Sequence, residues 1–514
     1  MEYVKEPANA VYQSGAKNPF LPLDIYIPDG EPKVFDGRVY LYGSKDEFDG
    51  EYCCHKFHVY SAPVSDLTQW TDHGPVLAST DEYEKEGIKK GVPWSNGLLW
   101  APDVTKKGEL YYFYFCLSDG TEGVAKSKNP YGPFEDAVQI TMGGKPIEGI
   151  DPSVLEDNGK YYYTWGQGHC HMAELNDDMC TLNPDTYEEA LINKDDDGHG
   201  FHEASSLRKV GDHYVIVYAS EFIDETHRNG GHPTNLDYAV SKSVAGPYVR
   251  KGRIIDNTGI DPQSWNNHGS IVKIENQWYV FYHGSSNNTK YARRARVERI
   301  EVDEERGIIE QVEMTSQGFS HGLDATAGIE AGWQCGLTGG AYLTEKEGRF
   351  PLVHITDGCS VKWRYAELAE DGEWSIEIEG TILSECGISI LANGESVGVV
   401  NAEDVDRQHI WKSSIGTLRS GRYELELQFF SEKEAIKAEI KAGLEGLAGQ
   451  IPGLLEIHVN INGLESSNAD LMLDSTFTDE AALKGYSVHP AHVAVANGKV
   501  RPHTAIRSCL DFTV

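Results

Sequence analysis

Pairs of short apolar runs recur along the N-terminal three fifths of the chain, and a tight polar turn separates the two runs of each pair. The turns carry Asp36-Gly37, Asn158-Gly159 or Gly211-Asp212, residues that suit short hairpin loops. The copies begin at Asp29, Ala101, Asp151, His202 and His268. One hairpin is too small to bury both of its faces, so the copies must stack against one another.

This repeat predicts a propeller. Further strand-like segments follow several of the hairpins, at 59–77, 123–136 and 238–252, and would supply outer strands. The copies start roughly 50 to 75 residues apart, close to the spacing of propeller repeats. We therefore predict a mainly β chain in which residues 1–318 form a five-bladed β-propeller of four-stranded sheets. An irregular β-sandwich is the alternative.

The pattern changes after Gly318. Short alternating runs with turn residues between them predict a β-sandwich over residues 319–421. Residues 422–514 predict a ferredoxin-like α+β domain of order β-α-β-β-α-β, with helices at 432–450 and 478–493 and a last strand at 505–514. The run Tyr423–Phe430 fits either the end of the sandwich or the start of this domain, and the sequence leaves the choice open.

The charge balance excludes two classes of partner. Asp and Glu number 80 against 45 Lys and Arg, a net charge of −35, and such a surface repels nucleic acid and anionic membranes. No apolar run approaches the ~18 residues of a membrane span, and the N-terminal residues lack a signal-peptide pattern. The 9 cysteines are scattered without a CxxC pair, which is typical of free thiols in a reducing cytoplasm. We therefore expect a cytoplasmic protein.

Chemistry-bearing residues stand at corresponding places of the repeat. The first strand of a propeller blade lines the central channel, so residues near its start converge on one end of the axis. The residues at this place are Asp29, Asp103, Asp151, Glu203 and His268. Carboxylates gathered in this way repel one another, which is costly unless they have a function. A lone Asp before Pro is usually a turn former, but several at equivalent places predict a catalytic site.

Five short segments carry a family resemblance. IPDGEP, LWAPDV, GIDPSVLED, FHEASSL and NNHGSIV occur in this order and resemble glycoside hydrolase family 43 over roughly residues 17–318. The resemblance implies an inverting hydrolase in which Asp29 is the general base, Glu203 the general acid and Asp151 the carboxylate that orients the acid. Such a site separates base and acid by about 6.5–9.5 Å. Asp24 rivals Asp29, because the family often has Asp-Pro at the base position and here Gly30 follows Asp29.

The resemblance implies three further site residues. His268 matches a channel histidine that in many relatives touches calcium or its waters, so we expect calcium there and no organic cofactor; a hydrogen-bonded core histidine is the alternative. Calcium prefers oxygen ligands, so one histidine supports it only weakly. Trp100 matches an aromatic wall of the sugar pocket. Arg293 matches an arginine beside the carboxylates, with Arg294 as the alternative.

The C-terminal third carries two more resemblances. The predicted sandwich is similar to a family 6 carbohydrate-binding module, with Trp363 and Tyr365 as candidate sugar contacts, although a packing domain without a sugar site fits better. The segments GQIPGLLEIHVNIN, STFTDEAALKGY, HPAHV and CLDFTV resemble the stress-responsive dimeric α/β-barrel family. This implies a homodimer formed through the C-terminal domain, in which we expect His489 and His492 to be structural.

The resemblance to family 43 also implies an activity. We expect an exo-acting α-L-arabinofuranosidase that trims plant cell-wall oligosaccharides derived from arabinoxylan or arabinan. A β-xylosidase of the same family is the nearest alternative, because the two sugars present similar geometry to the pocket. A non-catalytic sugar-binding propeller is the alternative from another class, and the presence of all three carboxylates argues against it.

Overall fold

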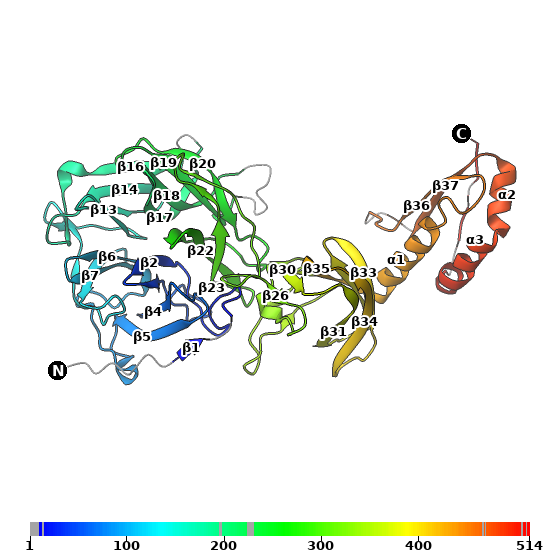
Figure 1. Cartoon of the computed structure of the whole chain (residues 1–514), viewed down its shortest axis with the longest axis horizontal. Helices are drawn as coiled ribbons and strands as arrows, with labels where there is room; N and C mark the ends of the chain where they lie inside the picture. Colours follow the sequence, from blue (N-terminus) through cyan, green and yellow to red (C-terminus); the bar gives the residue numbers. More distant parts are fainter. Residues whose placement is uncertain are drawn as a thin grey trace.

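The computed structural model describes residues 10–12, 15–194, 198–223, 231–464, 467, 469–504, 507–509 and 511–513. These residues are mainly β, as the sequence predicts. Figure 1 shows three bodies in chain order: a ring of sheets, a smaller β body and a C-terminal body with helices. All 9 cysteines are free thiols. Each described helix is too short or too polar to cross a bilayer.

Five antiparallel sheets, formed in chain order, build the ring in the described part of the chain. The first sheet contains β1 (Ala10–Tyr12), β2 (Glu31–Phe35), β3 (Arg38–Tyr42), β4 (Lys56–Pro63) and β5 (Trp70–Ala78). The second contains β6 (Leu99–Lys107), β7 (Leu110–Leu117), β8 (Glu122–Ser127) and β9 (Glu135–Gln139), and the third β12 (Ser153–Asp157), β13 (Lys160–Trp165), β14 (His169–Glu174) and β16 (Glu188–Asn193). The fourth contains β17 (Phe201–Val210), β18 (His213–Ser220), β19 (Asn235–Ser241) and β20 (Val249–Asp256), and the fifth β21 (Ser270–Ile274), β22 (Gln277–Ser286) and β23 (Thr289–Ile300).

Short elements connect or flank these sheets. They are β10 (Thr141–Met142), β11 (Lys145–Pro146), β15 (Thr181–Leu182), β24 (Val302–Asp303) and β25 (Ile308–Ile309), with one-turn helices at Glu84–Glu86 and Pro184–Thr186; a third one-turn helix, Ala331–Trp333, lies between β26 and β27 of the second body. The hairpin turns have the backbone that their residues favour. Asp36-Gly37 has φ angles of 48° and 77°, and Asn158-Gly159 has 54° and 78°. Positive φ at both positions is the geometry of a two-residue type I′ loop, which explains why these dipeptides mark the hairpins in the sequence.

The sheets close into a ring through apolar layers between neighbours. Each of five buried clusters is shared by two adjacent sheets. The closing cluster packs Leu41 and Trp70 of the first sheet against Phe281 and Val297 of the fifth. β21 also contacts β2. The last sheet thus buries apolar side chains of the first and closes the ring.

The first strands of the five sheets lie around one axis. β2, β6, β12, β17 and β21 all contribute to the wall of a single cavity of about 340 Å³. Apart from Trp278 on β22, the wall residues come from positions along these strands and not from the loops that precede them. The residues just before β2 and β12 therefore lie toward the opposite mouth of the ring, where the repeat predicts the site.

The second body is built around one large sheet. Its order is β26-β30-β35-β32-β33, with β27 also paired to β30, and a two-stranded sheet of β31 and β34 packs against it through a shared core. The strands are β26 (Leu323–Asp324), β27 (Gly336–Leu337), β28 (Tyr342–Leu343), β29 (Leu352–Val353), β30 (Ser360–Leu368), β31 (Gly372–Thr381), β32 (Cys386–Ala392), β33 (Glu395–Ala402), β34 (Gln408–Leu418) and β35 (Gly421–Ser431).

The segment Tyr423–Phe430 lies within β35, which pairs with both β30 and β32. It therefore belongs to the sheet of the second body. The C-terminal body starts one strand later than the predicted boundary at residue 422. Its first element is a helix whose N-cap, Ser431, accepts a hydrogen bond from the N–H of Glu434 (3.3 Å).

The C-terminal body contains two strands and three α-helices in its described residues. They are α1 (Glu432–Glu445), β36 (Leu454–Asn460), β37 (Met472–Phe477), α2 (Glu480–Val488) and α3 (Pro490–Val495), followed by single turns at Ala496–Val500 and Arg501–His503. The single helix predicted over 478–493 is wrong, because Pro490 has no N–H to continue α2. Of the strand predicted at 505–514, residues 505, 506, 510 and 514 lie outside the described residues, and the others are not in a strand.

Candidate functional site

Asp29 and Asp151 occupy equivalent places in two sheets. Each lies two residues before the first strand of its sheet, β2 or β12. Each has a positive φ, 56° for Asp29 and 58° for Asp151, and the side chains of both are buried. Glu203 is the third residue of β17 and is also buried, and Ala204 after it has a φ of 64°. Left-handed backbone at residues other than Gly costs energy and is concentrated at functional sites.

The carboxylate of Asp29 is held by three cationic or polar groups. Arg293 Nη1 donates to Oδ1 (2.9 Å), and the Nδ1 atoms of His283 and His268 lie 3.5 and 3.7 Å from the same oxygen. Burial alone would raise the pKa of Asp29, but Arg293 and the two histidines outweigh it and lower the pKa below its ordinary value. Asp29 is therefore ionised at neutral pH, as a general base must be.

Asp151 has the opposite electrostatic environment. Burial, then the charges of Glu203 and Asp29, raise its pKa well above the ordinary value. The N–H of Ala204 donates to its Oδ2 (2.9 Å), which favours the ionised form but offsets only part of this rise. The pKa values of two carboxyl groups in one site are thus shifted in opposite directions, and only one of the two groups has an arginine partner.

Glu203 is bound by side chains from two other sheets. Gln167 Nε2 donates to its Oε2 (2.8 Å), and Asn266 Nδ2 donates to its Oε1 (3.3 Å). His202 Nε2 lies 3.5 Å from Oε2. These contacts fix the carboxyl in one orientation next to Asp151, whose pKa it raises. A fixed carboxyl beside a second acid is the arrangement that proton donation to a leaving group requires.

His268 lies between the two aspartates. Its Nδ1 is 3.7 Å from Asp29 Oδ1 and 3.8 Å from Asp151 Oδ2, and burial lowers its pKa although Asp29 and Glu203 act to raise it. Among the described residues, no group of three or more His, Cys, Asp or Glu side chains is arranged to hold a metal ion. Arg293 already binds the carboxylate of Asp29. The residues present therefore do not fit a directly ligated calcium. A metal held through water by His268 alone stays a prediction.

The structure separates the two candidate arginines. Arg293 bridges two buried carboxylates, donating through Nη1 to Asp29 (2.9 Å) and through Nε and Nη2 to Asp46 (3.0 and 2.9 Å). Arg294 points elsewhere, donating to the carbonyl of Leu23 and to the hydroxyl of Tyr26. Arg293 is therefore the arginine of the site.

Trp100 is connected to the carboxylates through one cysteine. Cys116 Sγ accepts a hydrogen bond from the N–H of Asp151 (3.3 Å) and donates to the carbonyl of Trp100 (3.6 Å). The indole of Trp100 is partly exposed, and within the described residues its Nε1 has no hydrogen-bond partner. The ring is thus partly exposed, as an aromatic wall of a sugar pocket would be, whereas its Nε1 atom is buried.

Two other candidates from the sequence lie apart from this cluster. Asp24 is exposed in a turn, in contrast to the buried Asp29. Asp103 is fully buried inside the channel, where it pairs with Lys33 (2.8 Å) and accepts a hydrogen bond from the N–H of Val154 (2.8 Å). Asp103 is the fifth residue of β6, so it lies farther along the channel than Asp29 or Asp151 and serves the packing of the inner strands.

The sequence did not identify several residues that hold the site together. These are Asp46, Gln167, His283 and Asn266. None of them stands at the start of a repeat copy, and only Asn266 lies within a quoted family segment. The repeat pattern contains no signal for them, because their positions depend on loops and on the second strand of a sheet.

The candidates in the other two bodies have structural surroundings. Trp363 is buried in the core of the second body, and its Nε1 donates to the carbonyl of Glu330. His489 caps α3 by accepting from the N–H of Ala491 (3.3 Å), and the His492 ring packs on Tyr486 with centroids 4.1 Å apart. These contacts agree with the expected structural role of the two histidines.

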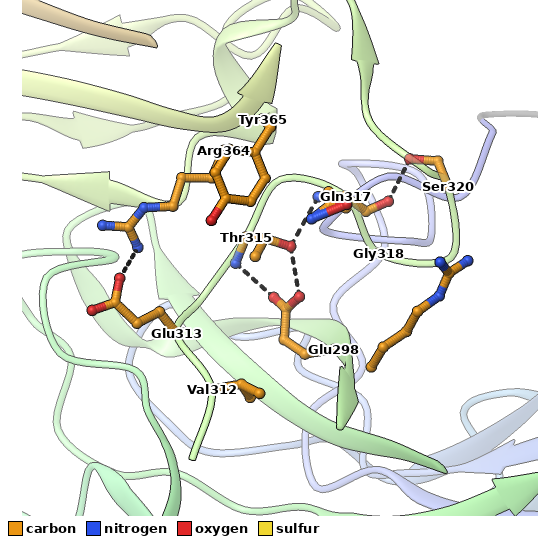
Figure 2. Close-up of a pocket in the computed structure, with 10 residues that line it drawn as sticks. Glu298, Val312, Glu313, Thr315, Gln317, Gly318, Ser320, Arg364 and Tyr365 are labelled. Carbon is orange, nitrogen blue, oxygen red and sulfur yellow. Dashed lines mark hydrogen bonds and ion pairs between the residues drawn. The ribbon is translucent and has the colours of Figure 1, made fainter. Parts of the chain in front are cut away.

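Tyr365 lines a cavity of about 320 Å³ between the ring and the second body. Figure 2 shows this cavity, with Glu298 accepting hydrogen bonds from Thr315 and with Glu313 paired to Arg364. The acidic groups in its wall thus already have partners within the protein. None of the predicted catalytic residues lines it, so it is separate from the site at the mouth of the ring.

Comparison with known proteins places two family models on the chain. The model described as Glycosyl hydrolases family 43 matches residues 16–307, and the model described as Stress responsive A/B Barrel Domain matches residues 428–514. The resemblances to these two families are thereby confirmed, and the resemblance to a family 6 carbohydrate-binding module stays a prediction. The first match contains the whole cluster around Asp29, Asp151 and Glu203, and the second begins within β35.

Three curated relatives show the extent of the similarity. A protein of Thermoclostridium stercorarium named Xylosidase/arabinosidase is 34% identical over 343 residues, which cover 59% of this chain and 67% of the relative. A Xylosidase/arabinosidase of Bacteroides ovatus is 27% identical, covering 55% of this chain and 94% of the relative. An Arabinoxylan arabinofuranohydrolase of Bacillus subtilis is 25% identical over 468 residues, covering 81% of this chain and 89% of the relative.

Proposed function

Since the chain belongs to glycosyl hydrolases family 43, we propose that it is an inverting exo-glycosidase that releases terminal α-L-arabinofuranose from arabinoxylan- or arabinan-derived oligosaccharides. The names of the relatives support the substrate class, because they pair xylosidase with arabinosidase activity or name an arabinoxylan hydrolase. In this proposal the ring is a five-bladed propeller, and the sugar binds at the mouth where Asp29, Asp151 and Glu203 meet.

Asp29 is the general base. Its carboxylate is ionised because Arg293 and the two neighbouring histidines stabilise the negative charge. It takes a proton from the water that attacks the anomeric carbon, so the new bond forms on the face opposite the leaving group. Arg293 leaves the charge on Asp29 in place while orienting the carboxylate through a hydrogen bond.

Glu203 is the general acid. It donates its proton to the glycosidic oxygen as the bond to the sugar breaks, so that the leaving group departs as a neutral hydroxyl. Asp151 is adjacent to it and fixes the following residue through the Ala204 N–H. Trp100, half-exposed beside Asp151, provides an aromatic contact for the sugar.

One observation carries the assignment. Asp29 and Asp151 are equally buried at equivalent places of two sheets, yet the pKa of one is lowered and that of the other is raised. Environments that push the pKa values of neighbouring carboxyl groups apart let one site hold an ionised base, Asp29, together with a second carboxyl group, Asp151, that orients the acid Glu203. A sugar-binding propeller without catalysis would gain nothing from such a division.

Substitution of the acid tests the proposal. Glu203→Gln keeps the shape of the side chain but has no proton to donate, so turnover of xylo-oligosaccharides that carry arabinofuranose should fall about 10²- to 10⁴-fold. An aryl glycoside with a good leaving group should lose much less activity. Wild-type turnover of the oligosaccharide by this variant would refute the role of Glu203.

Two product measurements test the finer parts of the proposal. The sugar released first should have the inverted anomeric configuration by NMR, and retention would rule out the single-displacement mechanism. The 4-nitrophenyl α-L-arabinofuranoside should be cleaved faster than the β-D-xyloside. The reverse order would favour the second candidate, a β-xylosidase, which the paired names of the relatives keep open.

The expected calcium has a direct test. Because Arg293 binds the carboxylate of Asp29 and His268 is the only predicted metal ligand within the described residues, no directly ligated calcium is expected, and dialysis against EDTA should leave activity and thermal stability unchanged unless a metal is held through water. A loss of either property that calcium restores would establish a metal held through water in the channel.

A further inference from the structure

Lys290 holds its ammonium group over three aromatic rings. It is the second residue of β23, the strand that also carries Arg293. Its Nζ atom lies 5.6 Å from the ring centroid of Tyr52, 5.4 Å from that of Trp265 and 5.3 Å from that of Tyr291. Lysine and rings are all partly exposed, so a ligand can reach them from solvent.

The ring of Tyr52 connects this lysine to the proposed base. It packs on the guanidinium of Arg293 at 4.6 Å, and Arg293 binds Asp29. Burial raises the pKa of Tyr52, and the charges of Glu203 and Asp29 act in the same direction, so the tyrosine lies close to both carboxyl groups. Within the described residues its buried hydroxyl has no hydrogen-bond partner. A buried polar atom without a partner requires an explanation, and a hydroxyl of a bound sugar provides one.

Trp265 connects the lysine to the proposed acid. Its ring stands edge-on to His202 with centroids 5.5 Å apart, and His202 Nε2 lies 3.5 Å from Glu203 Oε2. A general acid protonates the oxygen of the leaving group, so the leaving part of the substrate must lie beside Glu203. Trp265 and Lys290 are therefore on the side of the site where the leaving part of the oligosaccharide binds.

The positive charge of Lys290 has no anionic partner in the described part of the chain, where it makes neither an ion pair nor a hydrogen bond. Lys107 and Lys209 also lie over rings, but each has a carboxylate partner, Asp177 (3.0 Å) and Asp157 (2.9 Å). An unpaired lysine is unexpected in a chain with 80 Asp and Glu against 45 Lys and Arg. A partly buried ammonium group that its own chain leaves unpaired is suited to bind a carboxylate of a ligand.

We propose that Lys290 binds the carboxylate of a uronic acid unit in the leaving part of the oligosaccharide, so that the enzyme prefers acidic xylan-derived fragments. This rests on the proposed function, in which Glu203 protonates the leaving group. The rings of Tyr52 and Trp265 provide contacts for the apolar faces of the sugars, and the ammonium group pairs with the carboxylate. This pairing offsets the repulsion between an anionic substrate and a chain with a net charge of −35.

A matched pair of substrates tests the proposal. One is an arabinoxylo-oligosaccharide with a glucuronic acid branch on the xylose next to the arabinosylated one, and the other is the same compound with that carboxyl group reduced to an alcohol. The wild type should cleave the acidic compound with the higher kcat/KM, and equal values for the two compounds would overturn the proposal.

Lys290→Met keeps an apolar stem against the rings and removes the charge. Its kcat/KM for the acidic compound should fall about five- to tenfold, as expected for the loss of one partly buried ion pair. The value for the reduced compound should fall much less, because the rings remain. Lys290→Arg should keep the preference for the acidic compound, since a guanidinium group also stacks on rings and pairs with carboxylates.

A second lysine serves as the control. Lys107 lies over the ring of Tyr161 at 5.3 Å and is the last residue of β6, at the opposite end of that strand from Trp100. Lys107→Met removes the same charge from the same kind of contact outside the site. It should keep the wild-type ratio of kcat/KM for the two compounds. A change of this ratio equal to that in Lys290→Met would show an effect of net charge alone and would overturn the proposal.

The outcomes separate this proposal from the proposed function. If Glu203→Gln keeps full turnover of the reduced compound, the assignment of the acid fails. If Glu203→Gln loses turnover but Lys290→Met keeps the wild-type ratio for the two compounds, the proposal for Lys290 alone fails. Calorimetry of the acidic compound with Glu203→Gln measures the lysine without turnover. Adding Lys290→Met to this variant should raise Kd about five- to tenfold, and an unchanged Kd would contradict the role of Lys290.

Discussion

Arg293 contributes both a positive charge and packing contacts to the site. It is buried, it bridges Asp29 and Asp46, and it packs on the ring of Tyr52 at 4.6 Å. A planar guanidinium can hold two carboxylates at once, and a lysine ammonium cannot reproduce this geometry. Arg293, from the last strand of the fifth sheet, is thus the main cation that lowers the pKa of Asp29, the proposed base, with His283 and His268 acting in the same direction.

Arg293→Lys should weaken the contact with Asp29 while keeping a positive charge. Since the cation favours the ionised base, the pKa of Asp29 should rise and the acid limb of kcat/KM should move to higher pH, with a roughly tenfold loss at the optimum. Arg294→Lys, next in sequence but bonded to Leu23 and Tyr26, is the control and should leave the acid limb unchanged. An unmoved limb in Arg293→Lys would contradict the role of the arginine.

The sequence identified the residues whose positions the repeat fixes. Asp29 and Asp151 each stand two residues before an inner strand, so a pattern of strand starts was enough to find both. Asp46 and His283 could not be found in this way, because their contacts with Arg293 and Asp29 form only when the fifth sheet closes on the first. The pairing of carboxylates with cations is a property of the closed ring and not of the local sequence.

At the scale of elements, the conformation of the hairpin turns could be predicted from their residues, but the pairing of distant strands could not. The Asp-Gly and Asn-Gly dipeptides adopt the positive φ values that their side chains tolerate. The residue pattern of Tyr423–Phe430 predicts a strand but does not indicate which strands it pairs with. Its partners, β30 and β32, lie far from it in sequence. Pro490 marks the break between α2 and α3 in the sequence. The helical pattern of the residues on both sides of it nevertheless led to the prediction of one continuous helix.

One buried side chain fastens the last strand of the ring to the N-terminal segment. Asn18 Nδ2 donates to the carbonyl of Val297 (2.8 Å) and to Glu298 Oε1 (2.9 Å), and Asn18 Oδ1 accepts from the N–H of Val297 (2.9 Å). The amide thus substitutes for a neighbouring strand along β23. Since Asn18 is fully buried, water cannot replace it.

Asn18→Ala should lower the free energy of unfolding by about 2–4 kcal/mol, because it leaves buried backbone groups of β23 unpaired. Chemical denaturation of the whole chain measures this change. Asn176→Ala, which removes an exposed amide bonded to Thr181, should change the free energy by less than about 0.5 kcal/mol. Equal effects of the two substitutions would show that Asn18 does not fasten the ring.

At the scale of the whole molecule, the second body is joined to both of its neighbours in different ways. It is hydrogen-bonded to the ring, where Leu337 N donates to Gly259 O (2.6 Å) and Gln334 Nε2 donates to Ile260 O (3.0 Å). It continues into the C-terminal body through β35 and α1, which are adjacent in sequence. Figure 1 places the C-terminal body at the end of the molecule away from the ring. Events in the C-terminal body should therefore leave the chemistry at the mouth of the ring unchanged.

We propose that two copies of the chain associate through the small sheet of the C-terminal body. This sheet has two strands in the described residues, and it leaves Leu455 61% exposed and Met472 56% exposed. α1 and α2 pack on this sheet, and exposed apolar side chains such as these two, which no described element buries, are stabilised when a second copy covers them. The match of this region to the Stress responsive A/B Barrel Domain supports the same association.

Leu455→Asp places a charge in the proposed interface and should convert a dimer to a monomer in sedimentation velocity, because an unpaired carboxylate is costly to bury. Leu383→Asp, at a site in the second body that is 84% exposed, is the matched control and should remain dimeric. Both variants should hydrolyse the aryl arabinofuranoside at the wild-type rate, since the carboxylates of the site all lie in the ring. A wild-type chain that sediments as a monomer at high concentration, or a Leu455→Asp variant that remains dimeric, would show that this sheet is not the interface.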